Sequence, residues 1–273
     1  MIDGADRMDQ KIFTSLLTSA KEIAVEAGGK ILANTPKPGE INSKADGSPV
    51  TRADLASHHC IITGLSKLGP RLPIISEESD PDEYKDKLRS FEHYWLVDPL
   101  DGTKDFLKGN GEYTVNIALV HKSEPLMGVI YAPALDILYY AAQGTGAWKV
   151  MHSKKPFLLT GPKKKDHITA VISRSHPSAK TENFLARNNI HHCIKSGSSL
   201  KMCLIADGKA DIYPRFGPTS LWDTAAGCTI AREAGCRVVD LEGKNLHYEI
   251  CKNLLHSGFL VYSPETFIYK PLP

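Results

Sequence analysis

Residues 95–106 read WLVDPLDGTKDF, an apolar run that leads into two aspartates. The run at residues 94–97 predicts a buried strand, so Asp98 and Asp101 would stand at the end of a strand. Two carboxylates cost much free energy to bury unless a cation neutralises them. Oxygen ligands grouped this closely suit Mg²⁺ or Mn²⁺ rather than zinc. The alternative is an acidic surface turn, in which Asp-Pro and Asp-Gly serve only turn chemistry.

A feature suited to phosphate follows these aspartates directly. Gly102 and Thr103 stand where a helix is expected to begin. Backbone N–H groups at a helix start and the helix dipole both favour an anion. A metal ion and a phosphate would therefore meet within one turn of chain.

Two other segments carry acids at the ends of predicted elements. Residues 72–79 read LPIISEES, an apolar strand that ends in Glu77 and Glu78. Residues 220–227 read SLWDTAAG and place Asp223 just before a helix rich in small residues, where it could also be a plain helix N-cap. Acids from several such ends that converge on one cation cluster are typical of metal-assisted phosphoryl transfer. Spacing along the chain does not reveal whether they converge.

The first half of the chain predicts a mixture of helices and a mostly antiparallel sheet. Apolar residues at helical spacing predict a helix over residues 10–33. A polar loop over residues 40–54 then leads to a second helix that begins near Asp54. Short apolar runs predict strands at residues 72–76, 94–97, 113–120, 128–131 and 137–142.

Strands and helices alternate after the lysine cluster at residues 163–165. The predicted strands cover residues 168–172, 211–213, 237–239 and 259–262, and the predicted helices cover residues 180–188, 199–206 and 224–234. This change of pattern indicates two domains in an α/β (α+β) protein. Residues 1–162 would form an N-terminal α+β domain with the metal site, and residues 163–273 a C-terminal α/β domain.

Composition narrows the classes of function. The formal net charge of the 273 residues is only +2, so no global basic field favours a nucleic-acid polymer. Six scattered cysteines without a CxxC pair indicate reduced thiols in a cytoplasmic protein. We expect no signal peptide, and we expect no membrane-spanning helix because no apolar run reaches about 18 residues. The sequence does not decide whether the protein attaches peripherally to the cytoplasmic face of the inner membrane. It also does not decide between a monomer and a homodimer.

Three motifs together resemble the signature of the lithium-sensitive inositol monophosphatase superfamily. They are the Glu-Glu strand end at residues 76–78, the DPLDGT segment at residues 98–103 and the WDTAAG segment at residues 222–227. The resemblance covers nearly the whole chain and implies the layered αβαβα sandwich of these sugar phosphatases. Within the superfamily the chain is most similar to the 3′(2′),5′-bisphosphate nucleotidases of the CysQ type. That similarity lies in residues 110–118 (NGEYTVNIA), 197–201 (GSSLK) and 213–219 (YPRFGPT).

The resemblance implies a metal site for two or three Mg²⁺ ions, with Mn²⁺ as a substitute. The implied ligands are Glu77, Asp98, the Leu100 carbonyl, Asp101 and Asp223. It also implies catalytic roles for three residues. Thr103, held near Glu77, would orient the attacking water, and Asp54 with Lys44 would belong to a loop that closes over a third metal. For Asp54 the alternative is a helix cap.

The resemblance further implies a small nucleotide substrate, bound mainly by the C-terminal domain. Ser198, Lys201 and Arg215 would hold its 5′-phosphate, a role that suits an ammonium and a forked guanidinium. His176 would lie near the base, although it could equally belong to a surface turn. The implied reaction is the hydrolysis of 3′-phosphoadenosine 5′-phosphate, and also of its 5′-phosphosulfate, by direct attack of a metal-activated water. The implied setting is sulfur metabolism.

Three competing functions are weighed against this one. An inositol or sugar phosphatase of the same superfamily would share the metal motifs, but Lys201 and Arg215 argue against it. A nucleotide-binding protein without catalytic activity would be favoured if the chain lacked any of the carboxylates that the resemblance implies as metal ligands, but all of them are present. A calcium-binding loop is disfavoured because the loop from Asp98 lacks the required glycine and glutamate.

Overall fold

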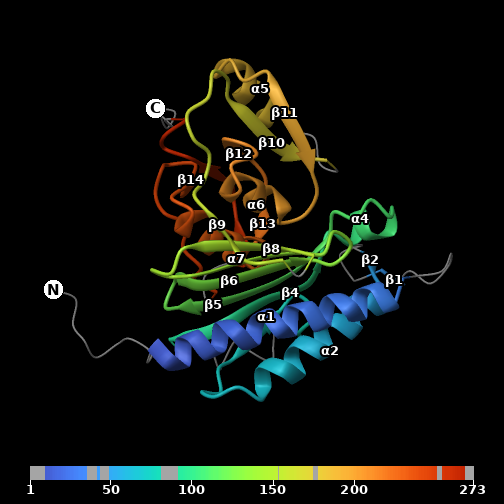
Figure 1. The fold of residues 1–273 in the computed structure, drawn as a ribbon. Helices are drawn as coiled ribbons and strands as arrows, with labels where there is room; N and C mark the ends of the chain where they lie inside the picture. The colour runs from blue at the N-terminus through green and yellow to red at the C-terminus, as the bar shows by residue number, and fades with distance from the viewer. Residues whose placement is uncertain are drawn as a thin grey trace.

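Five layers of alternating helices and sheets make up the computed structural model (Figure 1). It describes residues 10–35, 42–43, 49–80, 92–152, 154–174, 178–250 and 254–267. Two helices cover the outer face of a seven-stranded sheet, and two further helices separate that sheet from a five-stranded sheet with one helix on its far side. The layered sandwich expected from the sequence is therefore confirmed.

The seven-stranded sheet has the order β3-β4-β5-β6-β7-β8-β9. Its strands are β3 (Ile74–Ser76), β4 (His93–Asp101), β5 (Thr114–His121), β6 (Glu124–Ala132), β7 (Ile137–Ala142), β8 (Ala147–Met151) and β9 (Phe157–Leu159). β3 runs parallel to β4, and all other pairs are antiparallel. Successive side chains of β4 point to opposite faces, so Trp95 and Val97 enter one hydrophobic cluster and Leu96 enters another. Both faces of this sheet are thus buried.

Helices α1 (Gln10–Ala33) and α2 (Arg52–Ser66) form the outer layer. The apolar stripe of α1 packs against the sheet and against α2 because its buried residues recur every three or four positions. A Cβ on Gly28 of α1 would lie 2.6 Å from Tyr131 Cδ1, so glycine permits the close approach of this helix to β6. The outer layer holds the start of α2 beside the end of β4, and these two ends border the site described below.

Helices α6 (Leu200–Ala206) and α7 (Leu221–Glu233) form the middle layer. α7 lies across β4 to β8 of the large sheet. A Cβ on Gly128 of β6 would overlap the backbone of Ala226, so the small residues of α7 and this glycine bring helix and sheet into direct backbone contact. The small residues behind Asp223 therefore allow this close approach.

The five-stranded sheet has the order β11-β10-β12-β16-β14. Its strands are β10 (Thr169–Ser173), β11 (His192–Ser196), β12 (Ile212–Arg215), β14 (Arg237–Asp240) and β16 (Phe259–Tyr262). Helix α5 (Ala179–Arg187) covers its outer face through Leu185, which belongs to one buried hydrophobic cluster with Ala170, Ile212 and Leu260. The remaining short elements are β1 (Asn42–Ser43), β2 (Pro49–Val50), α4 (Thr103–Leu107), β13 (Thr219–Ser220) and β15 (Leu255–His256).

Several sequence-based expectations need correction. The last long helix begins at Leu221, so Asp223 lies in its first turn and is not its N-cap, which is Ser220. Strands β8, β9 and β11 were not predicted. The large sheet is built before residue 160 and the smaller one after residue 168, while the domain division at residue 162 stays a prediction. Within the described ranges, no helix has the length and apolar character to cross a membrane.

Candidate active site

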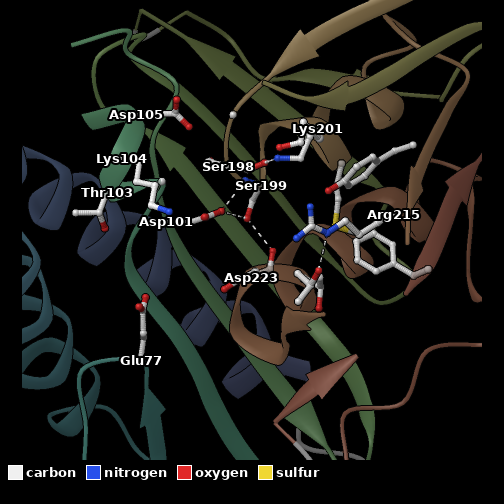
Figure 2. Close-up of a pocket in the computed structure, with 18 residues that line it drawn as sticks. Glu77, Asp101, Thr103, Lys104, Asp105, Ser198, Ser199, Lys201, Arg215 and Asp223 are labelled. Carbon is white, nitrogen blue, oxygen red and sulfur yellow. Dashed lines mark hydrogen bonds between the residues drawn. The ribbon is translucent and has the colours of Figure 1, made fainter. Parts of the chain in front are cut away.

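A cavity of about 330 Å³ lies where elements from both sheets end. It is lined by the end of β3, the turn from β4 into α4, the loop before α6, the end of β12 and the start of α7. Figure 2 shows Glu77 and Asp101 on one side of this cavity and Lys201 and Arg215 on the other, with Asp223 between them. One pocket therefore collects acids and bases that are far apart in the sequence.

A bulge at the end of β4 shapes the acidic side. Asp98 pairs with Asn116 and Asp101 with Thr114, so β4 has one more residue than β5 over this stretch. The extra length coincides with Pro99, whose nitrogen cannot donate to a ladder. Asp98 folds back within the bulge, and its Oδ1 accepts the Leu100 N–H at 3.0 Å. Only 1% of the Asp98 surface is exposed.

Burial and mutual repulsion act strongly on these acids. Burial raises the pKa of Asp98 well above its ordinary value, and the charges of Glu77, Asp101 and Asp223 raise it further. The pKa of Asp223 is raised by burial, then by Asp101 and Glu77. The four carboxylates are therefore close enough to oppose one another's ionisation. A divalent cation among them would remove this penalty.

The donor set fits a hard cation, because every side chain in it offers carboxylate oxygen. Across the described parts of the chain, no three acidic, histidine or cysteine side chains are already drawn together tightly enough to hold a metal ion. Glu77, Asp101 and Asp223 thus share the edge of one cavity without forming a closed cage, and Asp98 lies behind them. Their assignment as metal ligands stays a prediction.

The turn from β4 into α4 depends on Gly102. Its φ of +90° lies in the left-handed region that favours glycine, and a Cβ there would lie 3.2 Å from Glu112 O and 3.2 Å from Ser198 Cβ. The turn directs the Thr103 hydroxyl back toward α2, where Oγ1 donates to Asp54 Oδ1 at 3.2 Å. The Leu100 carbonyl oxygen is a second acceptor at 3.3 Å. The resemblance implied that Thr103 is held near Glu77; both residues line the cavity, and the Thr103 hydroxyl donates to Asp54.

Asp54 has two roles at the start of α2. Thr51 is the N-cap, and Asp54 is the third residue of the helix. Asp54 Oδ2 accepts both the Thr51 N–H at 2.7 Å and the Thr51 hydroxyl at 2.6 Å, which completes a capping box. Since Oδ1 faces Thr103, Asp54 contributes to the helix end and to the site with different oxygens.

The basic side of the cavity carries Lys201 and Arg215. Lys201 is 7% exposed, its ammonium donates to the Ser198 carbonyl, and it lies 5.5 Å from the centre of the Tyr213 ring. Burial lowers the pKa of Lys201, whereas the charge of Asp101 raises it. Arg215 Nε donates to Thr219 Oγ1 at 3.1 Å, which fixes the guanidinium at the mouth of the cavity.

A chain of hydrogen bonds that the sequence analysis did not predict links the two sides. Asp101 Oδ2 lies 2.6 Å from both the N–H and the hydroxyl of Ser199. Asn116 Nδ2 donates to the Ser199 hydroxyl at 2.8 Å, and the Thr114 hydroxyl lies 2.8 Å from the Ser198 hydroxyl. Thr114 and Asn116 are polar residues in a strand whose next residues, 117–120, are all apolar, and that contrast was the available signal.

Most of the residues expected at the site line this one cavity. They are Glu77, Asp101, Gly102, Thr103, Ser198, Lys201, Arg215 and Asp223. Asp98 and Leu100 lie behind them in the β4 bulge, and Asp54 reaches the site through Thr103. Lys44 and His176 fall outside the described residues.

Comparisons with known proteins agree on one family. The model of the inositol monophosphatase family matches residues 13–266. A 3′(2′),5′-bisphosphate nucleotidase CysQ of Shigella flexneri is 44% identical over 248 residues, which cover 90% of this chain and 99% of that protein. The crystal structure of CysQ from Bacteroides thetaiotaomicron superposes with a TM-score of 0.80 at 41% identity, covering 92% of this chain and 98% of that one. An inositol monophosphatase from Anabaena gives a TM-score of 0.70 at 25% identity, with coverage of 93% and 92%.

Proposed function

Since the chain belongs to the inositol monophosphatase family, we propose that it is a metal-dependent 3′(2′),5′-bisphosphate nucleotidase. Its substrate is 3′-phosphoadenosine 5′-phosphate, which water converts to AMP and inorganic phosphate. The P–O3′ bond breaks, a bond forms between phosphorus and the water oxygen, and the departing ribose oxygen gains a proton. The 5′-phosphosulfate analogue is a second substrate of the same site.

One observation carries the proposal: a single cavity holds both an acidic cluster and a separate pair of cations. Glu77, Asp101 and Asp223 suit the first phosphate through a metal, and Lys201 and Arg215 suit a second one directly. A substrate with one phosphate has no use for both. This is why we place the inositol and sugar phosphate esters second, although the fold serves them as well.

Glu77, Asp98, the Leu100 carbonyl, Asp101 and Asp223 would hold Mg²⁺ ions, which would neutralise the charges of the site and make a water molecule more acidic. The chain itself orients the reactants. Because the Thr103 hydroxyl donates its proton to Asp54, its oxygen lone pairs are directed to accept a hydrogen from the attacking water. Glu77 borders the same end of the cavity, where it receives the proton that the water loses.

The opposite side of the cavity positions the substrate. The buried ammonium of Lys201 and the guanidinium of Arg215 bind the 5′-phosphate, with Ser198 beside them. Holding the nucleotide at this end fixes the 3′-phosphate over the acids, and such positioning lowers the entropic part of the barrier. A third metal near Asp54 and Lys44, contact of His176 with the base, the cytoplasmic or membrane-peripheral location and the monomeric or dimeric state stay predictions.

A substrate comparison tests the proposal. The purified protein is assayed with Mg²⁺ on 3′-phosphoadenosine 5′-phosphate and on inositol 1-phosphate, with and without Li⁺. We expect kcat/KM for the nucleotide to exceed that for the inositol ester by at least about 100-fold, since the second phosphate finds two charged partners. Equal values, or a preference for the inositol ester, would replace the nucleotidase with an inositol phosphatase.

A further inference from the structure

Glu112 makes a dense set of contacts just outside the cavity. It lies in the segment between α4 and β5, and its side chain is 20% exposed. Its Oε2 accepts Arg174 Nε at 2.7 Å, and its Oε1 accepts an Arg174 terminal nitrogen at 2.7 Å. Oε2 also accepts the Gly197 N–H at 2.8 Å. One carboxylate therefore receives three hydrogen bonds, two of them from a forked guanidinium.

These contacts connect segments from both sheets. Arg174 follows β10, its guanidinium also donates to the Lys195 carbonyl at 2.7 Å, and its N–H donates to the Ser196 carbonyl at 3.1 Å. Glu112 therefore contacts the ends of both β10 and β11, and it belongs to the segment that leads into the large sheet. The last of these contacts is to Gly197, where the loop of residues 197–199 begins.

That loop sets the geometry of the site. Ser198 has a φ of 49°, in the left-handed region that is unusual for a residue other than glycine, and its carbonyl accepts the Lys201 ammonium. Ser199 binds Asp101. The backbone at Gly197 is also tightly packed, because a Cβ there would lie 2.6 Å from Asp105 Oδ2 and 2.8 Å from Glu112 O. A small displacement of the loop would therefore move the Ser198 carbonyl and, with it, the phosphate-binding lysine.

A purely structural ion pair is the competing explanation, and surface ion pairs usually contribute little to stability. Glu112 differs from such a pair because it binds a backbone N–H of the loop as well as the arginine. Although burial acts in the opposite direction, the hydrogen bonds from Arg174 and Gly197 keep the pKa of Glu112 below its ordinary value. The contacts therefore persist at neutral pH.

We infer that Glu112 and Arg174 are positioning residues that hold the loop of residues 197–199 in place, and thereby set the affinity for the second phosphate of the substrate. The inference rests on the proposed function. It predicts that loosening the loop weakens binding of a bisphosphorylated nucleotide far more than binding of a nucleotide with a single phosphate. A merely structural role would affect both substrates alike.

The experiment compares 3′-phosphoadenosine 5′-phosphate with adenosine 3′-monophosphate in the wild type, Glu112→Ala, Glu112→Gln and Arg174→Ala. We expect Glu112→Ala and Arg174→Ala to raise KM for the bisphosphate about tenfold. KM for the monophosphate and both kcat values should change less than about threefold. Glu112→Gln keeps an oxygen for the Gly197 N–H, so its KM should fall between those of the wild type and Glu112→Ala.

Glu124→Ala is the matched control. It removes an equally short contact, from Arg232 of α7 to Glu124 of β6 at 2.7 Å, which also joins the middle layer to the large sheet but lies away from the cavity. We expect KM for both nucleotides to stay at the wild-type value in this variant. The double variant of Glu112 and Arg174 should lose no more than either single one, because both residues act through one set of contacts.

The outcomes separate the two claims. If the wild type has the same KM for both nucleotides, the second phosphate is not bound, and the proposed function and the inference are both wrong. If the wild type distinguishes them but Glu112→Ala changes both KM values equally, or neither, only the inference is wrong. Should Glu112→Ala fail to fold, Glu112→Gln and Arg174→Ala decide in the same way.

Discussion

The two carboxylate oxygens of Asp54 serve different partners: Oδ2 completes the capping box with Thr51, and Oδ1 accepts the Thr103 hydroxyl at 3.2 Å. The start of α2 is thereby connected to the turn that follows β4. Stability and activity should consequently respond to different substitutions at this junction.

Thr51→Ala removes the cap and leaves the carboxylate facing Thr103. We expect a loss of about 1 kcal/mol in the free energy of unfolding, which is typical of an N-cap, with kcat within about threefold of the wild type. Asp54→Ala also frees the Thr103 hydroxyl, so kcat should fall about 100-fold while KM changes little. Urea unfolding and steady-state kinetics of both variants check this. Equal losses of kcat in the two variants would reduce Asp54 to a helix cap.

Arg215→Ala tests the basic side of the cavity. The guanidinium is fixed by Thr219 at the cavity, and Arg215 is less buried than Lys201, so its removal should leave the fold intact. We expect KM for 3′-phosphoadenosine 5′-phosphate to rise at least about tenfold, with a small change in kcat, because the interaction exists before and during the reaction. Arg215→Lys should recover only part of the affinity. An unchanged KM in Arg215→Ala would remove this residue from the substrate site.

Asp98→Asn separates the need for a metal from the stability of the fold. Burial and three neighbouring acids raise the pKa of Asp98 in the folded state, so the folded chain binds more protons than the unfolded chain above the ordinary pKa. Stability of the metal-free protein is therefore lost as pH rises through this range. Asparagine lacks the charge, and we expect metal-free Asp98→Asn to melt at or above the wild-type Tm at pH 8.

The same variant should be almost inactive. Loss of a metal-binding carboxylate removes several kcal/mol of transition-state stabilisation, so kcat should fall by about 10³-fold or more. Addition of Mg²⁺ should raise the Tm of the wild type and have a smaller effect on Asp98→Asn. Calorimetry with and without Mg²⁺ at pH 5 and pH 8 measures both effects. Wild-type turnover of Asp98→Asn in saturating Mg²⁺ would exclude Asp98 as a ligand.

The sequence predicted the parts of the fold whose pattern is strong in itself. The apolar run at residues 94–97 identified β4, although the strand continues four residues further, to Asp101. The long apolar stripe of α1 predicted that helix with its observed ends. β9 and β11 were missed because they are short, and most of their residues are exposed or only half-buried, which leaves no apolar alternation to detect. Edge strands form because a neighbouring strand offers free hydrogen-bonding groups, which is a tertiary effect.

The site also combines residues that the sequence pattern reveals with contacts that only the folded chain forms. Glu77, Asp101 and Asp223 could be selected because acids directly after apolar strands, or at a helix start, stand out along the chain. The contact of Ser199 with Asp101 could not be predicted, since it joins residues 98 positions apart that meet only when the loop before α6 reaches the end of β4. The contacts of Glu112 with Arg174 and Gly197 likewise arise only after both sheets are in place.

His256 should make the fold sensitive to acid, independently of the metal site. It lies in β15, its ring packs edge-on against Tyr248 at 5.0 Å between centres, and its Nε2 has no hydrogen-bond partner among the described residues. Burial lowers its pKa to about 4, although Asp240 acts to raise it. The ordinary histidine pKa of 6.5 applies in the unfolded chain. Between pH 6.5 and about 4, His256 is therefore protonated in the unfolded chain and neutral in the folded chain.

The stability contributed by neutral His256 is present above pH 6.5 and is lost as pH falls toward 4. At about 1.4 kcal/mol for each pKa unit, the loss amounts to about 3 kcal/mol at most. His256→Phe keeps a ring beside Tyr248 without a titrating group, so urea unfolding of this variant should depend less on pH between 4.5 and 7 than that of the wild type. His152→Gln, at a side chain that is 65% exposed, is the control and should follow the wild type. If His256→Phe kept the full pH dependence, a different group would have to bind the proton.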